Sequence, residues 1–265
     1  MKQRILSALV ALPILVVFLL YAGQTLFGCV LSLIAMLALH EFYGMGLPPH
    51  CRFEAWCGSL AGVAMTLAIL YAAGPFSLLA GIVFPVLGLS VLFLFRFKNL
   101  QQVGHDLAVI LLGLAYIPLL LVHAGLLRHL ESGRNWVFLV LVIVMVSDSL
   151  AYFVGRKWGR RKLYPAVSPN KSQEGAVGGL VGGLLGALLF KLSFFPALGW
   201  LDIVLLGTGI GIFSQVGDLV ESLFKRSFGV KDSGSLIPGH GGILDRLDSL
   251  LFAFPPAFYY ATWFY

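Results

Sequence analysis

The sequence predicts an all-α, polytopic integral membrane protein with about nine transmembrane helices. Three observations support this fold class. The 265-residue chain is 59% hydrophobic and only 11% charged, whereas a soluble domain is roughly half apolar and a quarter charged. Its apolar runs reach the roughly 18–20 residues that a helix needs to cross a bilayer. Its charged residues are concentrated in a few short segments between those runs.

The apolar runs give the expected helices in chain order. The first run is too long for the core of a cleaved signal peptide and has no clear small-residue cleavage site, so we expect a retained helix. The last-but-one run is long enough to tilt or to project beyond the bilayer. The expected spans cover residues 4–22, 25–42, 57–73, 75–96, 105–127, 135–155, 174–191, 200–226 and 246–265.

Polar residues divide the chain into three regions. Residues 1–100 form the N-terminal transmembrane helices, and residues 101–173 form a middle transmembrane region with a basic cytoplasmic loop. Residues 174–265 form a C-terminal transmembrane region that we expect to be catalytic. Most polar residues lie in two loops, 156–173 and 227–245.

The distribution of lysine and arginine predicts the orientation. If the N-terminus is cytoplasmic, 15 of the 18 basic residues lie on the cytoplasmic side, and only Arg128, Arg134 and Lys191 lie outside. Cytoplasmic loops of membrane proteins carry an excess of basic residues. Both polar loops are therefore expected to face the cytoplasm, where nucleotides are available.

The first polar loop contains the basic segment RKWGRRK, from Arg156 to Lys162. Such a segment can simply anchor the protein to anionic lipid. The segment SPNKSQEG follows it, and an anchor has no need for Ser168, Lys171 and Glu174 in a tight turn. Glu174 opens the next helix, and a helix N-terminus suits an anion. A role in substrate binding is therefore an alternative to the anchor.

The helix that follows this loop is rich in glycine. A glycine-rich phosphate loop would be one interpretation, but the lysine and serine that end a P-loop are missing. Small residues at every fourth position instead favour close helix packing. Two such series are present, Gly175, Gly179 and Gly183, and Gly178, Gly182 and Gly186.

The segment GDLVESLFKR places one polar stripe on an apolar helix. Asp218, Glu221, Ser222 and Lys225 follow the i, i+3, i+4, i+7 spacing of one helix face. The last helix repeats the pattern in ILDRLDSL, where Asp245 is three residues before an aspartate at position 248. Both helices are expected to turn these acids into the protein.

Three carboxylates near one membrane face require compensation, because unpaired buried charges are costly. They can form a structural network with lysine and arginine, or they can bind a hard divalent cation such as Mg²⁺. Acids that hold magnesium, beside bases that hold phosphates, are typical of nucleotide chemistry. The carboxylates are Asp218, Asp245 and Asp248, and the nearby bases are Lys225, Arg226, Lys231 and Arg246.

The loop between the two helices contains PGHGG. Gly239, Gly241 and Gly242 permit positive φ and the close approach of a ligand. His240 can orient a phosphate, bind a metal or pair with a carboxylate. Asp148 is a further candidate because intramembrane carboxylates are often functional, although it can also form a salt bridge to Arg156.

The remaining histidines and the cysteines carry no chemical signal in the sequence. His40 and Glu41 end the second helix, and the other scattered histidines are expected to be satisfied by packing. The three cysteines give no disulfide framework. Cys51 and Cys57 share a loop that we place in the cytoplasm, without partners at zinc-like spacing.

These motifs together resemble a known family. The segment 222–249 is similar to the signature of the phosphatidate cytidylyltransferases, or CDP-diacylglycerol synthases: a serine, Lys-Arg, Lys-Asp, His-Gly-Gly and Asp-Arg-x-Asp. The segment 148–175 resembles the region upstream of it, with mild departures at Ser172 and Gln173. The length, the basic N-terminus and the number of spans resemble a bacterial-type member. The signature residues are Ser222, Lys225, Arg226, Lys231, Asp232, His240, Gly241, Gly242, Asp245, Arg246 and Asp248.

The resemblance implies that CTP and phosphatidic acid give CDP-diacylglycerol and pyrophosphate in phospholipid biosynthesis. It also implies Mg²⁺, a paired metal centre with a second cation, and a homodimer in the bacterial cytoplasmic (inner) membrane. The partners are then CTP, phosphatidic acid and membrane lipid, and no nucleic acid.

The resemblance and the motifs together assign candidate roles to residues. The catalytic candidates are Asp218, Lys225, His240, Asp245, Arg246 and Asp248. The substrate-binding candidates are Asp148, Arg156, Ser168, Lys171, Glu174, Ser222, Arg226, Lys231, Asp232, Gly241 and Gly242. The metal candidates are Asp218, Asp245 and Asp248.

Two other functions remain open. A CTP-dependent polyprenol kinase would transfer the γ-phosphate of CTP and release CDP. A membrane transporter or channel is compatible with intramembrane acids and glycine-rich helices, but it does not explain the acids and bases gathered at one face. A CDP-alcohol phosphotransferase would carry Asp-Gly-x-x-Ala-Arg, which we do not find in this sequence.

Overall fold

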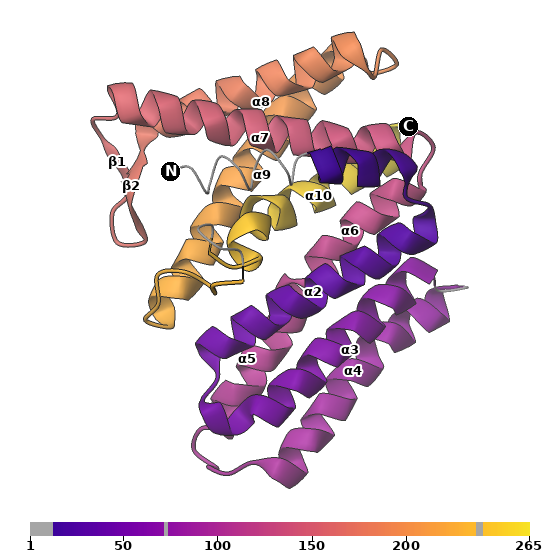
Figure 1. Ribbon diagram of the computed structural model, residues 1–265, viewed down its shortest axis with the longest axis vertical. Coiled ribbons are helices and arrows are strands. Elements are labelled where there is room, and N and C mark those ends of the chain that lie inside the picture. The colour runs from indigo at the N-terminus through magenta and orange to yellow at the C-terminus, as the bar shows by residue number, and fades with distance from the viewer. Residues whose placement is uncertain (1–12, 72–73, 237–240) are drawn as a thin grey trace. The chain divides into compact units, whose positions relative to one another are not determined.

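The computed structural model describes residues 13–71, 74–236 and 241–265, and it is helical apart from one short hairpin (Figure 1). The described helices and strands fall into two compact units. One unit contains residues 1–125 and 232–245, and the other contains residues 126–231 and 246–265.

The helices of the first unit pack against one another. α2 contacts α3, α3 contacts α4, and α5 contacts α2, α3 and α4. The proline at position 118 has no N–H and restricts the chain before it, which explains why the expected span 105–127 is divided into α5 and α6 at Ile117. The elements are α2 (Gln24–Gly46), η1 (Pro49–Cys51), α3 (Arg52–Tyr71), α4 (Pro75–Arg96), α5 (Val103–Tyr116) and α6 (Pro118–His129), which continues into the second unit.

A buried tyrosine fixes α2 in this unit. Tyr43 is 1% exposed, and its hydroxyl donates to the carbonyl of Ile110 at 2.9 Å. Gly58 on α3 and Gly113 on α5 lie against its ring, where an added Cβ would come within 2.9 and 2.4 Å of ring carbons. The two glycines therefore let three helices close around one side chain, next to the C-terminal end of α2.

The second unit contains the strands and the glycine-rich helix. α8 packs against both α7 and α9, and the strands form an antiparallel hairpin that pairs Lys162 with Ser172 and Tyr164 with Ser168. The expected loop 156–173 is therefore partly ordered as a hairpin. The elements are α7 (Gly133–Trp158), β1 (Lys162–Tyr164), β2 (Ser168–Ser172), α8 (Gln173–Ser193), α9 (Trp200–Ser227) and α10 (Leu244–Phe264), which begins in the first unit.

The glycines of α8 pack against two helices, as their spacing predicts. A Cβ on Gly182 would lie 2.7 Å from the carbonyl oxygen of Val146 on α7. A Cβ on Gly183 would lie 2.4 Å from the carbonyl oxygen of Gly207 on α9. The packing interpretation is confirmed because backbone atoms of both neighbours occupy the space of the missing side chains.

Seven of the described helices are long and apolar enough to cross a membrane. They confirm a polytopic α-helical membrane protein, but not the count of nine. The expected first span lies partly in residues 1–12, outside the described residues, and α10 is not among the seven. The seven are Gln24–Gly46, Pro49–Tyr71, Leu78–Arg96, Val103–His129, Gly133–Trp158, Gln173–Ser193 and Trp200–Ser227.

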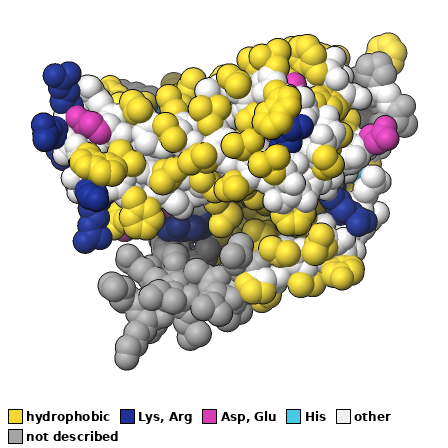
Figure 2. All heavy atoms as spheres, turned by 90° about the horizontal axis from the view of Figure 1, so that it is seen from above, with side chains coloured by type: hydrophobic (Ala, Val, Ile, Leu, Met, Phe, Trp, Pro, Cys, Tyr) yellow, Lys and Arg dark blue, Asp and Glu magenta, His cyan; other side chains and the backbone are white. Residues whose placement is uncertain are grey.

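The surface of the second unit matches a protein that meets lipid and water. Figure 2 shows apolar side chains over the α7 and α8 face, with basic side chains gathered at the end where the hairpin lies. Tyr152, Phe153 and Val177 are among the exposed apolar residues of these helices. The basic segment from Arg156 to Lys162 is exposed beside them. The two kinds of surface thus meet at the hairpin end of α7.

Candidate active site

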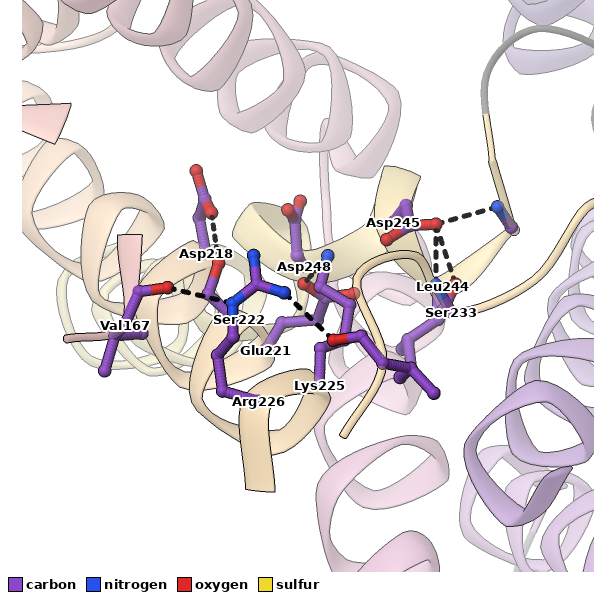
Figure 3. A network of polar contacts seen from close by, with 12 residues as sticks. Val167, Asp218, Glu221, Ser222, Lys225, Arg226, Ser233, Leu244, Asp245 and Asp248 are labelled. Atoms are coloured by element: carbon purple, nitrogen blue, oxygen red, sulfur yellow. Dashed lines mark hydrogen bonds and ion pairs between the residues drawn. The ribbon is translucent and has the colours of Figure 1, made fainter. Parts of the chain in front are cut away.

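Three aspartates come together in the second unit, each from a different helix. Asp148 is on α7, Asp218 on α9 and Asp248 on α10. Their carboxylates are near enough to interact electrostatically with one another. Figure 3 shows Asp218 and Asp248 pointing to the same side of their two helices. This group, the aspartate cluster, contains two of the three predicted metal ligands and the intramembrane acid at position 148.

A lysine from the hairpin contacts the aspartate cluster. The Nζ atom of Lys171 on β2 lies 2.7 Å from Oδ2 of Asp218. The hydroxyl of Ser222 is 3.5 Å from the other oxygen of the same carboxylate, a long contact. The hairpin therefore supplies a cation to the cluster, which the sequence did not place next to any particular acid.

A second ion pair lies one turn further along α9. Glu221 is 1% exposed, and its carboxylate is 2.5 Å from the ammonium of Lys225. The predicted polar stripe of α9 is therefore real, and its members pair with each other. Lys225 also interacts electrostatically with Asp248, so the pair lies beside the aspartate cluster.

The charges of these residues suit a divalent cation. The aspartate cluster and Glu221 provide four carboxylates, while Lys171 and Lys225 provide two ammonium groups. The formal charge of this set of six residues is therefore −2. Carboxylate oxygens are the hard ligands that Mg²⁺ prefers. The donor type and the charge of the aspartate cluster therefore fit a magnesium ion.

Other predicted binding residues hold the hairpin through backbone contacts. The guanidinium of Arg226 donates to the carbonyl of Val167 at 3.4 Å, as Figure 3 shows, and to the carbonyl of Val230 at 2.9 Å. The carboxylate of Glu174 accepts from the backbone amides of Arg160 and Arg161 at 3.0–3.2 Å. These two predicted substrate ligands therefore have a structural function in the described residues, and their contact with substrate stays a prediction.

A serine and two glycines position the hairpin against the helices. The hydroxyl of Ser172 accepts from the amide of Gly175 at 3.1 Å and so caps the N-terminus of α8. A Cβ on Gly159 would lie 2.6 Å from this hydroxyl, and one on Gly175 would lie 2.9 Å from the carbonyl of Ala151. This close packing holds β2, and hence Lys171, at the end of α7.

The third predicted metal ligand belongs to the first unit. Asp245 accepts through Oδ2 from the amide of Ser233 at 3.1 Å, from the hydroxyl of Ser233 at 2.9 Å and from the amide of Gly242 at 2.8 Å. Figure 3 shows these contacts around Asp245. Its role as a metal ligand stays a prediction, because each of these contacts is to the loop that precedes α10.

The glycine loop itself follows the prediction in part. Gly241 has φ of 81°, which favours glycine. Gly242 allows a close approach, but the group that approaches is a carboxylate of the protein, because an added Cβ would lie 2.3 Å from an oxygen of Glu41. His240 and Gly239 lie outside the described residues.

Glu41 is the residue that sequence reasoning missed. It lies near the end of α2, and its carboxylate accepts from the amides of Ile243 and Leu244, each at 2.9 Å, and from the hydroxyl of Ser233 at 3.1 Å. The only signal available was a carboxylate at the end of an expected span, which often indicates function.

The remaining predicted residues are exposed or make contacts within α7 and the hairpin. The guanidinium of Arg156 donates to the hydroxyl of Tyr152 at 3.1 Å, one turn away on α7. Lys231, Asp232 and Arg246 are exposed. Ser168 pairs with Tyr164 in the hairpin. Substrate contacts of these residues stay predictions.

A separate group of possible metal ligands lies in the first unit. One ligand atom each from His50, Cys51 and Asp106 lies within 4.8 Å of the others, so the three could hold a metal ion. Asp106 comes from α5, so the spacing of residues along the chain, which predicted no zinc-like partners for Cys51, does not indicate this group. The thiol of Cys51 is 3.5 Å from Asp106, whose other oxygen is 3.4 Å from a ring nitrogen of His105. Sulfur and imidazole ligands suit zinc better than magnesium.

The fold defines a class of protein, a polytopic α-helical membrane protein, and the aspartate cluster gives it carboxylates that suit a divalent cation. The chain belongs to the cytidylyltransferase family, which it matches from residue 2 to residue 264. It is therefore a nucleotidyltransferase.

Several relatives cover almost the whole chain. It is 34% identical over 260 residues to the phosphatidate cytidylyltransferase of Bacillus subtilis (strain 168), with 96% of this chain and 95% of the relative covered. It is 36% identical over 268 residues to the protein of that name from Staphylococcus aureus (strain COL), with 96% of each covered. The protein of that name from Staphylococcus haemolyticus is 37% identical over 266 residues, again with 96% of each covered.

Proposed function

We propose that this protein transfers the cytidylyl group of CTP to phosphatidic acid, forming CDP-diacylglycerol and pyrophosphate. The observation that carries the proposal is the aspartate cluster with Lys171 beside it, in a chain that belongs to the cytidylyltransferase family. The names of the relatives give the same reaction. A lipid substrate and a nucleotide substrate require a site where apolar helices meet water, as they do at the hairpin end of α7.

The reaction needs no nucleophile from the protein. A phosphate oxygen of phosphatidic acid attacks the α-phosphorus of CTP, and the bond to the bridging oxygen of the β-phosphate breaks. Pyrophosphate leaves with that electron pair. The attacking phosphate is a monoester with a second pKa of about 6, so it is already anionic near neutral pH. The protein then has to position two anions and neutralise their charge.

Residues of the second unit would bind the metal and a substrate phosphate. Asp148, Asp218 and Asp248 would hold Mg²⁺. When bound, the cation would neutralise triphosphate charge and polarise a phosphoryl oxygen. Lys171 pairs with Asp218 at 2.7 Å and can turn its ammonium to a substrate phosphate.

A second candidate function also uses CTP, but it breaks the bond between the β- and γ-phosphates. A CTP-dependent polyprenol kinase would attack the γ-phosphorus, so the two activities give different labelled products. Purified protein in detergent with phosphatidic acid and CTP labelled at the α-phosphate should yield labelled lipid that depends on Mg²⁺. CTP labelled at the γ-phosphate should yield labelled pyrophosphate and unlabelled lipid. Labelled lipid from the γ-position, with a polyprenol as acceptor, would overturn the proposal.

The site is proposed to face the cytoplasm of a bacterial inner membrane, because 15 of 18 basic residues lie on that side in our topology. In a variant without its native cysteines, a cysteine at position 132 should react with a membrane-impermeant thiol reagent on intact cells. A cysteine at position 235 should react only after the cells are opened. The reverse pattern of labelling would contradict the proposed orientation. The homodimer that the family resemblance implies also stays a prediction.

A further inference from the structure

Glu41, near the C-terminal end of α2, accepts three hydrogen bonds from residues in and next to the loop before α10. Its Oε1 atom accepts from the amide of Ile243 at 2.9 Å. Its Oε2 atom accepts from the amide of Leu244 at 2.9 Å and from the hydroxyl of Ser233 at 3.1 Å. Glu41 and its partners are separated by about 200 residues, and all of them belong to the first unit.

These amides lie at the start of α10. The first N–H groups of a helix have no partners within the helix, and the helix dipole favours a negative charge there. α10 begins at Leu244, and the carboxylate of Glu41 accepts from that amide and from the one before it. Glu41 therefore caps α10 from a different helix, in place of the serine or aspartate that usually precedes a helix.

Ser233 connects this cap to Asp245. Its hydroxyl lies 3.1 Å from Glu41 and 2.9 Å from Asp245, and its amide donates to Asp245 at 3.1 Å. Because one hydroxyl hydrogen serves one acceptor at a time, backbone amides have to compensate the two carboxylates. Ile243 and Leu244 do so for Glu41, while Ser233 and Gly242 do so for Asp245.

Two glycines of the loop lie against the carboxylate of Glu41. A Cβ on Gly234 would lie 2.8 Å from Oε1 of Glu41, and one on Gly242 would lie 2.3 Å from Oε2. Under 3.0 Å a neighbour has to move, so a side chain at either position would displace this carboxylate, and one at position 242 would also displace the hydroxyl of Ser233. The signature glycine at position 242 is thus complementary to a residue far outside the signature.

We propose that Glu41 is a positioning residue that fixes Ser233, the segment 241–245 and the carboxylate of Asp245 for cytidylyl transfer. The inference rests on the proposed function for its catalytic part only. Replacement of Glu41 by glutamine leaves one acceptor oxygen for two amides and one hydroxyl, so part of the anchor is lost and Asp245 loses the fixed orientation of Ser233. A displacement of about 1 Å at a reacting site costs up to about a hundredfold in rate.

The test compares three variants with a matched control. E41Q removes the charge and places an amide donor among donors, E41D keeps the charge on a shorter side chain, and S233A removes only the connecting hydroxyl. The control is E54Q, which removes the charge of another buried glutamate in the same unit, paired with Arg96 at 3.0 Å. The detergent-purified full chain is used throughout.

Hydrogen–deuterium exchange is measured first because it does not depend on the reaction. Deuterium uptake of the peptide covering residues 241–249 should be faster in E41Q than in the parent protein, intermediate in E41D, and unchanged in E54Q. Uptake in that peptide equal to the parent in E41Q would overturn the proposed anchoring, whatever the activity.

Steady-state kinetics then test the catalytic part. In E41Q we expect kcat to fall by about 10- to 100-fold, with a smaller change in KM for CTP, and E41D should recover part of kcat. E54Q should lower the unfolding temperature without the fall in kcat. Faster exchange with a parental kcat would show that the loop is anchored but not positioned for catalysis, which overturns that part. An inactive parent protein with faster exchange in E41Q would overturn the proposed function and leave the anchoring in place.

Discussion

The two carboxylate groups of this protein differ in what surrounds them. In the first unit, Glu41 and Asp245 are surrounded by backbone amides and by the hydroxyl of Ser233. In the second unit, the carboxylates of the aspartate cluster face one another and the ammonium of Lys171. Backbone donors cannot leave when a ligand arrives, whereas a lysine side chain can turn away. The first group is therefore suited to hold structure, and the second is suited to bind a cation and phosphates.

The largest effect is expected in the aspartate cluster. Asp218→Asn keeps the shape of the side chain but removes the charge that a hard cation requires. Turnover should fall on the order of a hundredfold or more, as when a principal electrostatic stabiliser is removed. The unfolding temperature should not fall, because one of three neighbouring acids is neutralised. CDP-lipid formation against magnesium concentration and thermal unfolding with and without magnesium measure both. Near-normal turnover at low magnesium would leave Asp218 as a structural partner of Lys171.

Asp245→Asn should lower the stability, unlike Asp218→Asn, and should lower turnover to a smaller extent. Its Oδ2 atom accepts three hydrogen bonds from Ser233 and Gly242, and an amide cannot replace all of them. Loss of a hydrogen bond to a charged group costs about 1.5–3 kcal/mol, so we expect a lower unfolding temperature and a loss of about tenfold or more in turnover. The magnesium dependence decides between two roles. If the magnesium requirement of this variant rises as it does for Asp218→Asn, Asp245 is also a metal ligand and the contrast between the two groups disappears.

Lys171→Met tests the cation that the hairpin supplies. Methionine keeps most of the length of the side chain and removes the ammonium 2.7 Å from Asp218. If Lys171 turns to a substrate phosphate, KM for CTP should rise by about tenfold, the magnitude of one charge-assisted hydrogen bond. Lys162→Met, on the partner strand and exposed, is the matched control. An equal rise of KM for CTP in both variants would mean that Lys171 only attracts anions through its charge and does not bind a particular phosphate.

Ser222→Ala should have the smallest effect. The hydroxyl of Ser222 is 3.5 Å from Asp218, near the limit of a hydrogen bond. We expect turnover to change by only about two- to threefold, because a long hydrogen bond contributes well under 1 kcal/mol. A loss as large as that of Asp218→Asn would mean that Ser222 contacts substrate directly, and that the site extends further along α9 than the aspartate cluster.

The helices and their packing faces were open to prediction because their signals are local. Apolar length predicts a span, and glycine at every fourth residue predicts close packing, which Gly182 and Gly183 of α8 confirm. The polar stripe of α9 was also readable, since residues three and four apart share a helix face. The hairpin 162–172 could not be predicted, because its strands are too short to show an alternating pattern of polar and apolar residues.

The sequence by itself determined the membrane class, the helices, and which segments carry acids and bases. Only the tertiary structure decided the partner of each acid. Asp218 is near Asp148 and Lys171 because α7, α9 and the hairpin pack together. The spacing of residues along the chain does not indicate that these elements are neighbours. Glu41 became important only when the amides of Ile243 and Leu244 came within 2.9 Å of it. A helical period shows which face of a segment is polar, but backbone amides from distant residues leave no pattern in the sequence.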